Sequence, residues 1–121
     1  PIYVNYLQLG GNSIFNLVSG GVVTTNVDFR TGQGPGNSAT ANISGTGSIT
    51  VNGEFQIGNA LGTGVVNMSG GNVVANSWVA IGRDGGTGTL NLSGGIGTTV
   101  TTWQVNVGNG TSVVPVTIRY L

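Results

Sequence analysis

A short phrase recurs at almost constant spacing along the chain, and this repeat constrains the fold more than any other feature. Each copy joins an apolar residue to a serine and a glycine, and the serines step by 25, 25 and 24 residues. The four copies are Val18-Ser19-Gly20-Gly21, Ile43-Ser44-Gly45-Thr46, Met68-Ser69-Gly70-Gly71 and Leu92-Ser93-Gly94-Gly95. A second phrase, an apolar residue before glycine, alternates with the first at Leu9-Gly10, Ile57-Gly58, Ile81-Gly82 and Val107-Gly108. Two markers at one period indicate an array of equivalent units, each too small to fold alone.

Apolar and polar residues alternate inside each unit, as in Val66-Asn67-Met68 and Leu90-Asn91-Leu92. A period of two predicts β-strands. Glycine and β-branched residues interrupt every stretch that could otherwise propagate a helix. The sequence therefore predicts an all-β fold, a parallel β-solenoid (β-helix) of about five coils of roughly 25 residues, with three short strands in each coil.

Stacked coils bring equivalent positions of successive units on top of one another, so the repeat also predicts the core. One predicted stack contains Ile43, Met68 and Leu92. A second predicted stack contains Ile57, Ile81 and Val107. Sharp corners between the strands require backbone with positive φ, which glycine adopts without a Cβ clash.

The 121 residues are predicted to form one solenoid domain, residues 1–121, with the repeats at residues 8–110. Residues 1–7 and 111–121 are apolar, strand-like extensions outside the repeat. Because neither a helix nor a polar cap is evident at the ends, we expect these extensions to pair with further copies of the chain. The residues expected at this self-assembly contact are Ile2, Val4, Tyr6, Val114, Val116, Ile118 and Tyr120.

Charge is almost absent, which excludes several classes of partner. Three arginines balance three acidic residues, and lysine, histidine and cysteine are missing. Without a basic patch the chain is not expected to bind nucleic acid. No apolar run approaches the roughly 20 residues that span a bilayer, so membrane insertion is not expected either. A surface with so few charges favours self-association, and the Gly-, Thr- and Asn-rich composition favours a secreted, extracellular or cell-surface protein.

The acidic residues do not form a catalytic pattern. Asp28, Glu54 and Asp84 occur once per coil, whereas sugar-cleaving enzymes need clustered carboxylates. Asp28 and Glu54 are 26 residues apart, which places them on adjacent coils where Arg30 could neutralise them. The run after Asp84 lacks the aspartate in every turn that calcium-binding glycine-rich repeats carry. We therefore expect no enzymatic activity, no cofactor and no metal site.

Four asparagines satisfy the Asn-x-Ser/Thr rule for N-glycosylation. They are Asn42, Asn67, Asn91 and Asn109. The first three recur at one position per coil, so an amide ladder between stacked coils is the simpler interpretation. Glycosylation would depend on the host cell and stays open.

Lateral faces of the solenoid offer a second kind of function. Trp78 is offset by one residue from the predicted inward positions of its strand, so we expect it to point outward and to contact a neighbour or a glycan. The other aromatic residues that arrive once per coil, Phe29, Phe55 and Trp103, are expected mostly in the core. The threonines of residues 98–102 suggest ice binding as a further possibility. The equivalent stretches of other coils, however, do not continue a threonine row.

Residues 62–71 and 86–95 share the order Gly-Thr-Gly, an apolar/Asn alternation and Ser-Gly-Gly. This pattern resembles the passenger-associated β-solenoid repeats of bacterial autotransporters and related extracellular surface proteins, over about residues 7–110. The resemblance implies secretion and a structural or adhesive role, and it carries no catalytic residue. We expect an extracellular structural protein whose subunits join end to end into a filament or surface stalk. The alternative is an adhesin-type passenger segment that binds glycan, a surface or ice through a lateral face.

Overall fold

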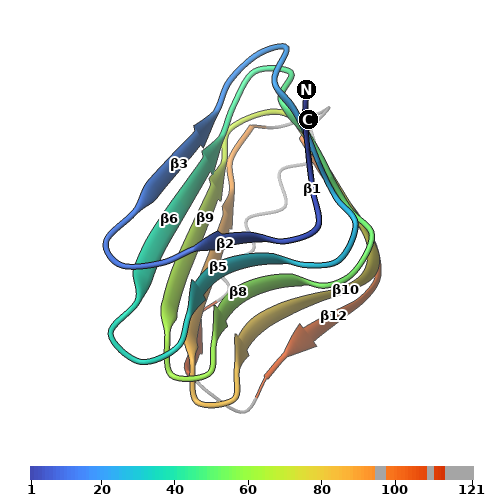
Figure 1. Ribbon diagram of the computed structural model, residues 1–121. Helices are drawn as coiled ribbons and strands as arrows, with labels where there is room; N and C mark the ends of the chain where they lie inside the picture. Colours follow the sequence, from blue (N-terminus) through green and yellow to red (C-terminus); the bar gives the residue numbers. More distant parts are fainter. Residues whose placement is uncertain (95–97, 109–110, 114–121) are drawn as a thin grey trace.

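The chain winds into a parallel β-solenoid of about four turns, as the computed structural model in Figure 1 shows. The structure describes residues 1–94, 98–108 and 111–113, and this part of the chain contains no helix. The all-β solenoid predicted from the repeat is confirmed. The number of turns is about four rather than about five, because five strands stacked on one face are separated by only four turns.

Each turn contributes strands to three faces. The first face stacks β1 (Ile2–Val4), β4 (Val22–Thr25), β7 (Ser48–Val51) and the first halves of β10 (Asn72–Arg83) and β12 (Thr99–Val107). The second face stacks β2 (Leu7–Leu9), β5 (Phe29–Gln33), β8 (Phe55–Asn59) and the second halves of β10 and β12. The third face is a separate sheet of β3 (Ile14–Leu17), β6 (Ser38–Ile43), β9 (Thr63–Met68), β11 (Thr87–Leu92) and β13 (Thr111–Val113).

The corner between the first and second faces changes character along the solenoid. In the third turn this corner contains Gly53, and it separates β7 from β8. In the next turn the corner is Asn76-Ser77-Trp78, and β10 runs through it as one strand (Figure 1). The predicted three strands per coil therefore merge into two where β10 and β12 pass the corner.

The predicted core stacks are vertically aligned. Ile43 pairs with Met68 and Met68 with Leu92. Ile57 pairs with Ile81 and Ile81 with Val107. The members in the middle turns are completely buried, and Leu92 is partly buried against them.

Val107 does not behave as a core residue, although it lies in the expected column. Its side chain is 59% exposed, so the prediction that it is buried is wrong. The cause is its position on β12, which pairs with β10 on one side and with no other strand of the described chain. A residue can therefore face inward and remain exposed when no further turn covers it.

A further inward column contains the aromatic residues Phe29 and Phe55, which pair in register. The ring of Phe29 lies 5.0 Å from that of Phe55 and 5.9 Å from that of Phe15, measured between centroids. Phe29 and Phe55 are completely buried, as expected from their period. Such tilted and edge-to-face contacts add to the apolar area that each ring buries.

The third face carries the amide ladder on its outer side. Asn42 donates through Nδ2 to Oδ1 of Asn16 at 2.9 Å, Asn67 donates to Asn42 at 3.0 Å, and Asn91 donates to Asn67 at 2.8 Å. The predicted ladder is confirmed. It uses the nitrogen that N-glycosylation would modify, so a sugar at Asn42, Asn67 or Asn91 would have to fit between coils. Asn109 lies outside the described residues.

Candidate functional site

Charged side chains gather on the second face, while the first and third faces are uncharged over the described residues. Each charged residue lies on β5 or β10, or within one residue of β5, β8 or β10. The five are Asp28, Arg30, Glu54, Arg83 and Asp84. The parallel register brings them together, because Phe29 pairs with Phe55, and Asn59 pairs with Arg83. This charged face is the densest group of chemically active side chains in the described chain.

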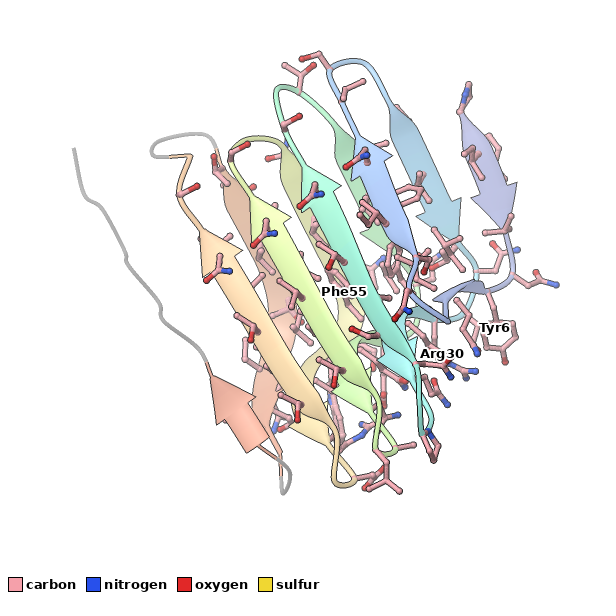
Figure 2. The ribbon with its side chains drawn as sticks, turned by 90° about the vertical axis from the view of Figure 1, so that its left-hand side faces the viewer. Tyr6, Arg30 and Phe55 are labelled. Atoms are coloured by element: carbon pink, nitrogen blue, oxygen red, sulfur yellow. The ribbon has the colours of Figure 1, made fainter. Side chains whose placement is uncertain are left out.

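One half of the charged face is built around Asp28. Its Oδ2 accepts an ion-pair contact from Arg30 at 3.0 Å, and its Oδ1 accepts the backbone N–H of Glu54 at 2.8 Å. The guanidinium of Arg30 lies 4.7 Å from the ring centre of Tyr6, and Figure 2 shows these two side chains together at the edge of the solenoid. Such a cation–π contact ties the first turn to the second. Asp28 thus links its own corner to the equivalent corner of the next coil, at Glu54.

The other half is built around Glu54 and Arg83. Nη2 of Arg83 lies 2.7 Å from Oε2 of Glu54, and Gln56 donates to the same oxygen at 3.0 Å. Asn59 in turn donates to Gln56 at 2.9 Å. Gln56 and its register partner Ala80 point away from the core, yet both are buried. The ion pair and its neighbours therefore cover this part of the outer face.

The hydrogen bond from Arg83 keeps the pKa of Glu54 below its ordinary value, against the opposing effect of burial. The same hydrogen bond raises the pKa of Arg83. Glu54 is therefore ionised at neutral pH, as its ion pair with Arg83 requires. In the searched residues, no three His, Cys, Asp or Glu side chains form a group that could hold a metal ion.

Sequence reasoning located only part of this arrangement. The expected proximity of Asp28 and Glu54 on adjacent coils is confirmed, as is the neutralisation of Asp28 by Arg30. The pairing of Glu54 with Arg83, 29 residues away, was not anticipated. The repeat aligns Arg83 with Asn59 and not with Glu54, so equal spacing did not signal this contact.

Acid should weaken the contribution of Glu54 to stability. Because its pKa is lower in the folded chain than in the unfolded chain, its stabilising effect is fully present above the ordinary value of 4.5 and is lost as pH falls through the lower folded pKa. We expect urea denaturation to show a smaller loss of stability between about pH 7 and about pH 3 for Glu54→Gln than for the unchanged chain. An equal loss in both proteins would show that this ion pair does not contribute.

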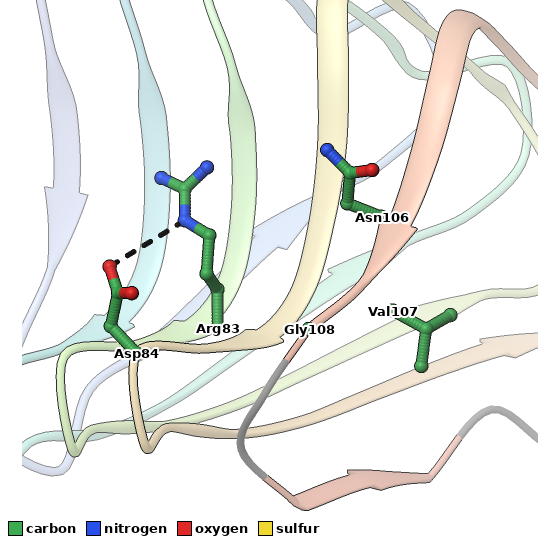
Figure 3. A pocket seen from close by; sticks show the side chains of 5 residues that line it. All are labelled: Arg83, Asp84, Asn106, Val107 and Gly108. Carbon is green, nitrogen blue, oxygen red and sulfur yellow. Dashed lines mark ion pairs between the residues drawn. The ribbon is translucent and has the colours of Figure 1, made fainter.

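A shallow depression lies beside the charged face, lined by Arg83, Asp84, Asn106, Val107 and Gly108 (Figure 3). Arg83 Nε lies 3.8 Å from Asp84 Oδ2 at its rim. Further along the same strands, Trp78 pairs with Gln104 and is 40% exposed. The prediction that Trp78 points outward is confirmed.

The N-terminal residues predicted for self-assembly belong to the first turn. Ile2 and Val4 lie on β1, which pairs with β4, although we expected residues 1–7 as an extension outside the repeat. Ile2 is 49% exposed and Val4 is half-buried. Tyr6 is exposed, and the guanidinium of Arg30 lies over its ring. The C-terminal residues of this prediction lie outside the described residues, and they are Val114, Val116, Ile118 and Tyr120.

Among the described residues there is no helix that could span a membrane. Comparison with known proteins adds no assignment, since no family model, no curated protein and no solved structure matches this chain.

Proposed function

We propose that this chain is an extracellular structural protein, a β-solenoid unit that joins other copies end to end in a filament or surface stalk. The observation that carries the proposal is that inward columns of the described solenoid have half-exposed members at both ends. Ile2 is 49% exposed at the head of a column in which Val23 and Ile49 are completely buried. At the other end Val105 and Val107 are more than half exposed. Half-exposed core residues favour a partner that completes the packing.

The two ends are suited to each other. Leu7 and Val105 are the first and last members of one inward column, and Leu9 and Val107 are the first and last members of the next. A head-to-tail joint would place each last member against the first member of the same column in the following copy. Apolar packing and parallel strand direction would continue across the joint. The free edge of β1 would supply main-chain hydrogen bonds, as in strand addition.

Other features support a structural rather than a catalytic role. The acidic side chains near the coil corners are held in ion pairs, which suits a clasp between coils. The low charge of the chain reduces repulsion between copies. The resemblance of residues 62–71 and 86–95 to autotransporter passenger repeats supports secretion and a place at the cell surface.

The substitution Ile2→Asp tests the joint. It puts a carboxylate at the head of an inward column, where burial without a partner costs several kcal/mol at every joint. Gln8→Asp is the matched control, because Gln8 lies in the same turn on β2, between the inward residues Leu7 and Leu9, with its side chain outward and exposed. We expect sedimentation velocity to show concentration-dependent assembly for the unchanged chain and Gln8→Asp, and monomers for Ile2→Asp. A chain that stays monomeric at every concentration would overturn the proposal.

Lateral binding is a second candidate function, favoured by the exposed indole of Trp78 beside Gln104. Gln104 donates to Asn106 at 2.9 Å, so an aromatic surface adjoins a row of planar amides. Aromatic rings and amides together suit a neutral saccharide, which offers both C–H and hydroxyl groups. Tryptophan fluorescence titrated with a panel of oligosaccharides should respond in the unchanged chain and lose that response in Trp78→Ala. Titrations without any response would leave this candidate without support.

A further inference from the structure

Large apolar side chains point outward from the first turn of the solenoid and from the start of β4, which follows it. We call this group the collar, and its members are Tyr3, Ile14, Val18 and Val22. Their exposed fractions are 73%, 68%, 62% and 41%. The collar residues are not inward members of the columns, because their neighbours Ile2, Phe15, Leu17 and Val23 hold those positions. The collar therefore lies on the outside of the first and third faces at this end of the solenoid.

Later turns carry polar residues at almost all of these positions. The register aligns Tyr3 with Thr24 and Thr50, Ile14 with Thr40, and Val22 with Ser48 and Asn72. Val18 follows Leu17 as Ser44 follows Ile43. The exceptions in later turns are Val65, Val74 and Val113, of which Val65 and Val74 are half-buried. Away from these positions, Leu61 and Trp78 are exposed in later turns, so most but not all of the outward apolar side chains lie at the N-terminal end of the solenoid.

A simple head-to-tail joint does not cover the collar. Coil stacking buries the inward columns and the strand edge, whereas outward side chains remain beside the joint, in contact with water as they are in the middle turns. Exposed apolar patches of this kind mark contacts with another segment. Whatever covers the collar must lie along the outside of the first turn.

We propose that the collar is covered by residues 114–121 of the neighbouring copy in the filament. This inference rests on the proposed function. The segment follows β13 (Thr111–Val113) at the end of the solenoid opposite to the collar, so in a head-to-tail joint it starts beside the first turn of the next copy. A fully extended stretch of eight residues reaches about 26 Å, which suits a path around the corner between Ile14 and Val22.

The sequence of the segment fits this surface. Apolar residues alternate with others, so that an extended chain has one apolar side and one that carries Thr117 and Arg119. The apolar side consists of Val114, Val116, Ile118 and Tyr120. Residues 1–22 contain no charged side chain, so Arg119 meets no cationic side chain there. Pro115 cannot donate a ladder hydrogen bond, which suits a segment at the edge of a sheet or outside it.

The test replaces each collar residue with the residue that the following turn carries at the same position. The full-length variant Tyr3→Thr, Ile14→Thr, Val18→Ser and Val22→Ser takes its new residues from Thr24, Thr40, Ser44 and Ser48. Because the replaced side chains are exposed in a single copy, thermal unfolding of the monomer should not change. Sedimentation velocity should show association weakened at least tenfold. A synthetic peptide with the sequence of residues 113–121, in excess, should block assembly of the unchanged chain. A peptide with aspartate at positions 116 and 118 should not.

Several results would overturn the inference. If the collar variant assembles like the unchanged chain while Ile2→Asp does not, the filament stands and the role of the collar fails. If the collar variant stays monomeric but the peptide neither binds nor blocks assembly, another surface covers the collar. If the collar variant is a monomer with a lowered unfolding temperature, the segment lies on its own first turn. If the unchanged chain never assembles, the proposed function fails together with this inference.

Discussion

Replacing Gly58 with alanine is expected to abolish folding of the solenoid. Gly58 has φ +68° and lies on β8, where a Cβ atom would collide with the carbonyl group of Thr87 and the backbone nitrogen of Gly88 on β11. Neither strand can move away without losing hydrogen bonds, because the colliding atoms belong to the backbones of two hydrogen-bonded sheets. The left-handed conformation alone costs a non-glycine residue about 1–2 kcal/mol. With the collision added, we expect a loss of more than about 4 kcal/mol, a large part of the stability of a small domain.

Gly20→Ala is the matched control for this prediction. Gly20 has φ +81°, but a Cβ atom there meets nothing within 4 Å. The substitution therefore imposes the backbone strain without the collision and should cost about 1–2 kcal/mol. Circular dichroism during thermal unfolding would compare the two variants. Equal stability of Gly58→Ala and Gly20→Ala would show that the close approach of β8 and β11 is not a feature of the folded chain.

Replacing Phe55 with alanine is expected to have the second largest effect. Phe55 is 1% exposed, lies in the middle of its column and contacts the ring of Phe29. Removing such a ring from a packed core costs about 3–5 kcal/mol, through lost apolar burial and the cavity left behind. The parallel strands above and below are held in register and cannot collapse far into this cavity.

Phe15→Ala serves as the comparison, because Phe15 also contacts Phe29 but is only partly buried in the first turn. It should cost clearly less than Phe55→Ala when both are measured by urea denaturation. If the two substitutions were equally destabilising, the middle turns would not be more tightly packed than the first turn. That result would contradict the description of the core as columns that weaken toward uncovered ends.

The repeat in the sequence predicted the stacked arrangement because a fixed period determines which residues lie on top of one another. The pairing of Ile43 with Met68 and the ladder through Asn42 and Asn67 follow directly from equal spacing. Burial did not follow in the same way, as Val107 shows. Whether a stacked residue is buried depends on the next turn, and a period contains no information on where stacking stops.

The charged face was only partly predictable for a related reason. The contact between Asp28 and Glu54 joins equivalent corners of adjacent coils, so the repeat period predicted it. The pair of Glu54 and Arg83 joins non-equivalent positions, and it depends on how a long side chain crosses the outer face. The period also does not show whether a strand continues around a corner, as β10 does.

Electron cryo-microscopy of the concentrated protein tests the central claim, that these solenoid units join head to tail, most directly. Five stacked strands at about 4.8 Å give an axial length of about 24 Å per copy. We expect filaments with that axial repeat and with strands perpendicular to the filament axis. Separate particles the size of one copy at every concentration, or filaments in which copies meet through their lateral faces, would contradict it.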